Sequence, residues 1–107
     1  MTRQGERLRD RAFTAAEIAY CEERANSYQH YAARFAAKEA AFKAIGTGWH
    51  DGIGWHDAEV KNELSGKPSL ILSGRALEIA QRLGARCFWL SLSHTDAYAV
   101  AQVVLEG

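Results

Sequence analysis

The sequence predicts a single α+β domain, residues 1–107, in which antiparallel β-hairpins pack on a long central helix. Three observations support this fold class. A helical pattern without breakers runs from residue 27 to residue 46. Short segments of alternating polarity, separated by turn residues, fill the second half of the chain. The resulting order is helix, helix, strand, strand, helix, strand, strand, without an internal repeat or linker.

The composition is that of an ordinary globular protein, with 48% hydrophobic and 24% charged residues. Thirteen basic residues balance thirteen acidic ones, which argues against a general nucleic-acid binder. No apolar run approaches the ~20 residues that span a bilayer, and the N-terminus lacks an apolar signal core. Two scattered cysteines suit a reducing cytosol. We therefore expect a cytoplasmic protein without nucleic-acid or membrane partners.

The first half of the chain has helical patterns. Four arginines against two acidic residues make residues 1–13 locally basic, which suits either a solvated terminus or a surface for an acidic partner. Thr14 and Glu17 have the spacing of a capping box, so a short helix is expected to follow. Ser27 is predicted to cap the central helix, and Gly46 is predicted to end it.

The central helix carries alanines on one side and aromatic residues on the other, so we expect it to be covered on more than one side. Its charges form two pairs at i,i+4 spacing, Arg34 with Lys38 and Glu39 with Lys43. A carboxylate and three cations on a largely apolar helix suit an anionic ligand with a metal ion. They also suit solvated pairs worth a few tenths of a kcal/mol each, and the pattern taken alone favours this second interpretation.

The second half of the chain is predicted to form two hairpins with a helix between them. The first hairpin turns at residues 64–67, and Pro68 stands at a strand start, where proline is tolerated. The helix covers residues 75–83 and ends at Gly84. The second hairpin turns at residues 94–96. The predicted strands are residues 55–63, 68–72, 86–93 and 97–105.

Three segments together resemble one family. They are Arg34–Gly48, which begins Arg-Phe-Ala-Ala-Lys-Glu-Ala, the turn Ser65–Pro68, and the hairpin Ser91–Ala99. Their order and intervals also match. The chain is identified on these motifs as a member of the holo-acyl-carrier-protein synthases, the small bacterial 4′-phosphopantetheinyl transferases. The resemblance covers about residues 7–106.

The resemblance implies a magnesium-dependent transfer of 4′-phosphopantetheine from coenzyme A to a serine of apo acyl carrier protein. Adenosine 3′,5′-bisphosphate is released. Glu39 falls on the family's metal-ligand position, and Lys43 falls on the position that contacts phosphate and stabilises the leaving group. These two residues are the implied catalytic residues. The resemblance leaves three alternatives for the general base: water, a metal-bound hydroxide and a side chain of the partner.

The resemblance also implies contacts with both substrates and with further copies of the chain. Three of the implied coenzyme contacts also have a purely structural explanation. Gly66 and Pro68 would be expected in any hairpin turn, and His94 could simply be a turn residue. The family assembles as trimers with sites between subunits, so a homotrimer is implied. The implied coenzyme contacts are Arg34, Lys43, Gly66, Lys67, Pro68 and His94, and the implied carrier-protein contacts are Arg7, Arg9 and Arg11.

One feature of the family pattern is missing. That pattern begins with a short apolar strand carrying an aspartate, the second metal ligand, whereas residues 1–12 contain no such strand. Asp10 lies too close to Thr14 to match. We expect that the natural start is absent, through a misplaced start codon or an artificial boundary; a genuinely shortened form is the alternative. Two alternative functions are then considered beside the transferase activity. One is a non-catalytic binding module for coenzyme A or carrier protein, and the other is a structural subunit without a ligand.

Overall fold

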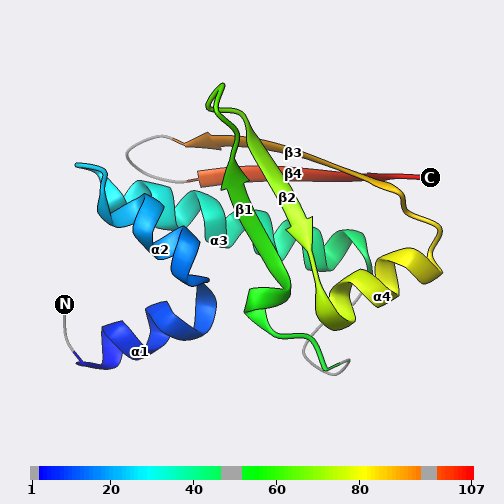
Figure 1. The fold of residues 1–107 in the computed structure, drawn as a ribbon, viewed down its shortest axis with the longest axis horizontal. Helices are drawn as coiled ribbons and strands as arrows, with labels where there is room; N and C mark the ends of the chain where they lie inside the picture. The colour runs from blue at the N-terminus through cyan, green and yellow to red at the C-terminus, as the bar shows by residue number, and fades with distance from the viewer. Residues whose placement is uncertain (1–2, 47–51, 95–98) are drawn as a thin grey trace.

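The computed structural model describes residues 3–46, 52–94 and 99–107. It confirms the α+β class and the predicted order of helices and strands, and it adds a helix, α1, at the start of the chain (Figure 1). Within the described residues, no helix is long and apolar enough to cross a membrane. The elements are α1 (Arg3–Ala12), α2 (Ala15–Glu22), α3 (Ser27–Ala44), the 3₁₀ helix η2 (Trp55–Asp57), β1 (Ala58–Asn62), β2 (Pro68–Leu72), α4 (Gly74–Arg82), β3 (Cys87–His94) and β4 (Ala99–Glu106).

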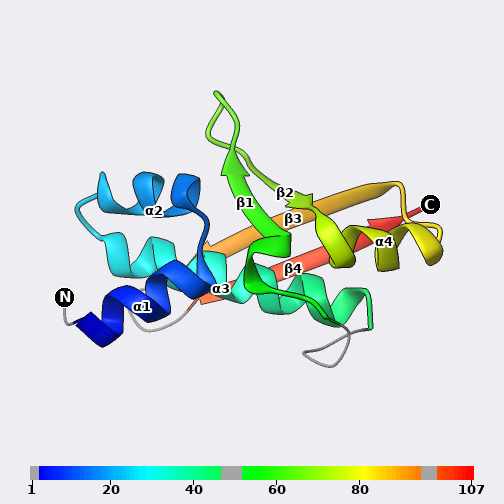
Figure 2. The ribbon, with the colours of Figure 1, turned by 60° about the horizontal axis from the view of Figure 1, so that its bottom comes forward.

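Both predicted hairpins form as antiparallel pairs. β1 pairs with β2 so that Asn62 faces Pro68, and β3 pairs with β4 so that His94 faces Ala99. Helix α3 runs along β4 and past the β1–β2 hairpin, while α1 and α2 lie at one end of the molecule and α4 at the other (Figures 1 and 2). The long central helix therefore supports both hairpins.

The core lies between α3, the two hairpins and α4. On the α3 side, Ala41 and Phe42 belong to the core. Ala33 and Ala37 are also buried, and such small side chains let neighbouring elements approach the helix closely. The aromatic side of α3 is mixed, since Phe42 is buried whereas Tyr28 is 82% exposed. Inward-facing residues of β3 and β4 cover the core from the other side. Its buried members are Ala41, Phe42, Ile45, Ile53, Ala58, Leu70, Leu72, Ala76 and Ala80.

The predicted cap of the central helix is wrong by one residue. Asn26 occupies the N-cap position, and no side chain caps this helix. The Asn26 amide instead donates to Oε1 of Gln29 at 2.7 Å. Ser27 is the first helical residue, and Gly46 ends the helix with a φ of 70°, as predicted.

The first predicted strand starts too early. Trp55–Asp57 form a 3₁₀ turn, closed by the Asp57 N–H donating to the Gly54 carbonyl at 3.0 Å. The turn places Trp55 against Phe35, with ring centroids 4.7 Å apart, a contact that an extended strand pattern does not reveal. The predicted turn residue His94 instead ends β3. Residues 95–98, the rest of that predicted turn, lie outside the described residues.

Candidate active site

The four charged residues of helix α3 fall into two sets. Arg34 and Lys38 are buried, at 3% and 0% exposure, whereas Glu39 and Lys43 are exposed. Five residues along a helix correspond to a rotation of about 140°, so Arg34 and Glu39 face different directions. The interpretation as solvated pairs is therefore wrong for Arg34 and Lys38, whereas Glu39 and Lys43 are exposed to solvent.

Lys38 uses its three ammonium protons inside the molecule. It donates to Oε1 of Glu17 at 2.7 Å, to the Trp55 carbonyl at 3.0 Å and to the Ala58 carbonyl at 2.6 Å. Burial lowers the pKa of Lys38, and the Glu17 carboxylate opposes that shift. The side chain thereby fixes η2 and the start of β1 against α3.

Glu17 is the buried partner that the sequence did not reveal. The predicted capping box is confirmed, because Oε1 of Glu17 accepts the Thr14 N–H at 2.9 Å. Its other oxygen, Oε2, accepts the Val60 N–H of β1 at 2.9 Å. A capping glutamate usually lies at the surface, so its spacing gave no signal of a partner on a strand more than forty residues away.

Arg34 connects α3 to the tip of the first hairpin. Its guanidinium donates to Oδ1 of Asn62, and its central carbon lies 4.0 Å from the ring centroid of Tyr20. Nε of Arg34 is buried without a hydrogen-bond partner. Asn62 in turn donates through Nδ2 to the Gly66 carbonyl at 3.0 Å. The structure thus links two of the sequence-predicted residues, Arg34 and Gly66, through Asn62, which sequence reasoning missed.

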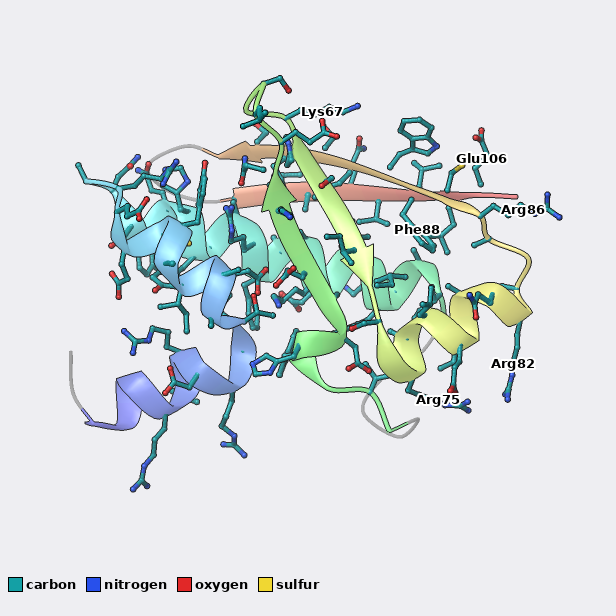
Figure 3. All side chains as sticks on the ribbon, viewed as in Figure 1. Lys67, Arg75, Arg82, Arg86, Phe88 and Glu106 are labelled. Atoms are coloured by element: carbon teal, nitrogen blue, oxygen red, sulfur yellow. The ribbon has the colours of Figure 1, made fainter. Side chains whose placement is uncertain are left out.

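The turn at Gly66 stands at the exposed tip of the hairpin. Gly66 has a φ of 91°, a left-handed conformation that favours glycine. Lys67 extends from this tip (Figure 3), with Nζ 5.7 Å from the ring centroid of Trp89. Pro68 begins β2 opposite Asn62. The predicted coenzyme contacts Gly66, Lys67 and Pro68 therefore lie on the same side of the molecule as Arg34.

Glu39 borders a hollow of about 410 Å³ on the other side of α3. Ala99 of β4 also lines it, so the end of the second hairpin, where His94 pairs with Ala99, lies close by. Lys43 follows one helical turn after Glu39. Among the described residues, no group of three histidine, cysteine, aspartate or glutamate side chains is placed to hold a metal. The hollow is lined by Phe13, Tyr28, Tyr31, Ala32, Phe35, Ala36, Glu39 and Ala99.

The predicted carrier-protein contacts lie on α1. Arg7 and Arg11 are exposed, whereas Arg9 donates to Oε1 of Glu22 at 3.1 Å. A hollow of about 570 Å³ separates α1 from the chain around Trp55, and Arg11 lines it. Helix α1 lies apart from the tip of the β1–β2 hairpin (Figure 2).

A model of the 4′-phosphopantetheinyl transferase superfamily matches residues 1–103. The chain belongs to this superfamily. The holo-[acyl-carrier-protein] synthase of Koribacter versatilis (strain Ellin345) is 54% identical over 104 residues, which covers 97% of this chain and 83% of that protein.

Solved structures of the same kind share the fold of this phosphopantetheinyl transferase family member. The holo-[acyl-carrier-protein] synthase of Neisseria meningitidis matches with a TM-score of 0.84 and 27% identity, covering 96% of this chain and 82% of that one. The enzyme of Helicobacter pylori in complex with coenzyme A matches with a TM-score of 0.81 and 26% identity, covering 98% and 86%.

The exposed charges of this transferase-superfamily chain suit phosphate chemistry. Magnesium commonly takes one or two carboxylates, with waters and phosphate oxygens completing its shell. The exposed carboxylate of Glu39 fits one such position. The ammonium of Lys43 is a compact cation on the next turn, suited to phosphate oxygens. Glu39 is therefore the residue type for one magnesium ligand, and Lys43 is the residue type for a phosphate contact.

Proposed function

We propose that this chain transfers 4′-phosphopantetheine from coenzyme A to a serine of apo acyl carrier protein. The observation that carries the proposal is the exposed Glu39–Lys43 pair beside an aromatic hollow, on a helix whose other charges are buried. The 54% identity with a holo-[acyl-carrier-protein] synthase supports the same activity.

In the reaction, the serine oxygen forms a bond to the β-phosphorus of coenzyme A. The bond between that phosphorus and the oxygen bridging it to the α-phosphorus breaks, and adenosine 3′,5′-bisphosphate leaves with the bond's electron pair. Lys43 binds pyrophosphate oxygens and stabilises the charge that develops on the leaving group. Glu39 would hold magnesium, which when bound neutralises pyrophosphate charge. The serine proton goes to a general base, which is water, a metal-bound hydroxide or a side chain of the partner.

The coenzyme is proposed to be held from two sides. Arg34 and the Gly66–Pro68 turn form one set of contacts, and Lys43 and His94 form the other. Arg34 and Glu39 face different directions on α3. Both sets of residues can contact the same coenzyme molecule if one copy of the chain supplies the first set and a neighbouring copy supplies the second. The proposed assembly is therefore a homotrimer with sites between subunits.

The outer face of the second hairpin supports this assembly. Trp89, Val100 and Val104 are 51%, 50% and 58% exposed there, and Trp89 pairs with Val104 across the two strands. Large exposed apolar side chains on one strand face, an aromatic one among them, suit a protein–protein interface. Light scattering after gel filtration measures the mass directly, and a monomer at micromolar concentration would contradict the trimer.

Carrier protein is proposed to bind at α1 through Arg7, Arg9 and Arg11. Acyl carrier protein is acidic, so these side chains steer its approach. The free cysteines Cys21 and Cys87 suit a reducing compartment, and the proposed location is the cytoplasm.

The decisive experiment incubates the chain with apo acyl carrier protein, coenzyme A and Mg²⁺ and records the carrier's mass. Gain of the phosphopantetheine mass, together with release of adenosine 3′,5′-bisphosphate, is the expected result. Binding of coenzyme A by calorimetry without that release would replace the transferase with a non-catalytic binding module. A melting temperature unaffected by coenzyme A would favour the structural subunit, since a ligand at 100 times its Kd adds about 2.7 kcal/mol.

A further inference from the structure

Asn62 occupies a junction between three elements. It is the last residue of β1, and it faces Pro68, the first residue of β2. Both ends of its amide are engaged: Oδ1 accepts a hydrogen bond from Arg34 of α3, and Nδ2 donates to the Gly66 carbonyl at 3.0 Å. A single planar group therefore joins the central helix to the hairpin turn.

The helix side of this junction is rigid. Arg34 is 3% exposed, so its guanidinium has little room to change rotamer. The Tyr20 ring of α2 lies 4.0 Å from that guanidinium, and the guanidinium of Arg24 lies 3.4 Å from the same ring. Asn62 thus bonds to a cation that α2 and α3 hold in place.

The turn side is exposed. Residues 64–67 are all exposed at the hairpin tip, beyond the core. The turn closes on itself through the Gly66 N–H, which donates to the Glu63 carbonyl at 2.8 Å, and through the Glu63 N–H, which donates to the Lys67 carbonyl at 2.8 Å. These bonds fix the shape of the turn, whereas the bond from Asn62 fixes its position relative to α3.

We infer that Asn62 is a positioning residue for coenzyme A: it holds the Gly66–Pro68 turn at a fixed place relative to Arg34, so that both contact one ligand. The inference rests on the proposed function, in which Arg34 and the turn are coenzyme contacts. Asn62 itself acts through these two groups. An amide suits the task because it offers an acceptor to the cation and a donor to the carbonyl at once.

Three variants separate this role from a general contribution to stability. Asn62→Ala removes both hydrogen bonds. Asn62→Asp keeps the acceptor for Arg34 but replaces the donor to Gly66 by a second acceptor, which repels the carbonyl. Ser69→Ala is the matched control, because Oγ of Ser69 donates to the Lys61 carbonyl at 3.0 Å on the same hairpin without touching Arg34.

The readouts are the Kd of coenzyme A by calorimetry, the KM values for coenzyme A and carrier protein, kcat, and the melting temperature. Both Asn62 variants are expected to raise the Kd and KM of coenzyme A about three- to tenfold, the effect of one hydrogen bond. Their kcat at saturating coenzyme A and their KM for carrier protein stay at the wild-type values. Asn62→Asp, which keeps the bond to Arg34, melts at or above the temperature of Asn62→Ala. Ser69→Ala keeps the wild-type Kd.

Coupling to Lys67 gives a further test. If Asn62 acts through the turn, then removing the Lys67 contact leaves fewer contacts between the turn and coenzyme A that depend on Asn62. In a Lys67→Ala background, the Asn62→Ala change should raise the Kd by a smaller factor than in the wild type. The same factor in both backgrounds, or a wild-type Kd for Asn62→Asp, would overturn the inference. Because calorimetry measures binding without turnover, failure of the wild type to transfer phosphopantetheine contradicts the proposed function separately.

Discussion

Nζ of Lys38 lies 2.7 Å from Oε1 of Glu17, and neither side chain is exposed to solvent. The pair joins α2 to α3, and Glu17 also accepts the Val60 N–H of β1 at 2.9 Å. Three elements therefore meet at one buried ion pair. Each charge depends on the other, because an isolated charge in a protein interior is costly.

Lys38→Met is expected to destabilise the chain by about 3–5 kcal/mol, because it leaves the Glu17 carboxylate buried without its cation. It also removes the donor to the Trp55 and Ala58 carbonyls, which anchor the start of β1. Chemical denaturation followed by circular dichroism measures the free energy of unfolding.

Lys61→Met is the matched control for this prediction. Lys61 is an exposed lysine on the neighbouring strand, and its replacement should change stability by no more than about 0.5 kcal/mol. If Lys38→Met cost as little as this control, the buried pair would not hold these elements together.

Local patterns predicted the elements well, whereas the sorting of the α3 charges needed the tertiary structure. Helical spacing placed Arg34 and Lys38 on one face and Glu39 and Lys43 on another, but spacing does not say which face meets solvent. The answer depends on Glu17 of the preceding helix, α2, and on the carbonyls of Trp55 in η2 and Ala58 in β1. A lysine is rarely buried without such partners, so sequence reasoning treated it as solvated.

Asn62 escaped the sequence analysis for a similar reason. An asparagine at the end of a strand is a common turn neighbour. Its importance follows from the register that places it beside Gly66 and from the packing that brings Arg34 to it. The pattern of charges on α3 allowed a ligand site but favoured solvated pairs, so family resemblance decided for Glu39 and Lys43. Both side chains are exposed.

Because of Cys21, the free energy of unfolding is expected to fall as the pH rises in the alkaline range. Burial raises the pKa of its thiol to about 11, from an ordinary 9.0 in the unfolded chain. Between these values the native state binds more protons than the unfolded state, so stability falls as pH rises. The contribution to the slope is at most about 1.4 kcal/mol per pH unit. Urea unfolding at half-unit steps between pH 9 and 11 measures it.

Cys21→Ala should flatten this part of the stability curve, even though losing a buried sulfur lowers the stability at every pH. Comparison of slopes removes that constant cost. Tyr31, whose pKa burial raises to about 12, and Lys38, whose pKa burial lowers, are present in both chains. Cys87→Ala, which removes an exposed thiol, is expected to keep the wild-type slope. Equal slopes in all three proteins would contradict a titrating Cys21.

Glu39→Gln is expected to lower kcat by about 100-fold or more, because an amide holds magnesium much less well than a carboxylate. The side chain is exposed, so stability should change by no more than about 0.5 kcal/mol. Steady-state transfer to apo acyl carrier protein over a range of Mg²⁺ concentrations measures the effect. Glu78→Gln, an exposed glutamate of α4, serves as control. Full activity in Glu39→Gln would remove Glu39 from the metal site.

Arg7 and Arg11 test the carrier-protein surface on α1. Both are exposed, whereas Arg9 is already paired with Glu22 at 3.1 Å. Reversing both charges, Arg7→Glu with Arg11→Glu, should raise the KM for acidic carrier protein roughly tenfold at low salt, because steering by exposed charges acts on association. The KM for coenzyme A should stay unchanged. Kinetics at 20 mM and 500 mM salt, values chosen to span strong and weak screening, measure both constants.

Arg82→Glu is the control for this charge reversal. Arg82 is an exposed arginine of α4, at the opposite end of the molecule from α1 (Figure 3). Its reversal alters the net charge without altering α1, so the KM for carrier protein should remain within about twofold of the wild type. The α1 variant should also lose most of its salt dependence, since screening has no attraction left to weaken. If Arg82→Glu impaired the carrier reaction as much as the α1 reversal, net charge would explain the effect, and α1 would not be the carrier surface.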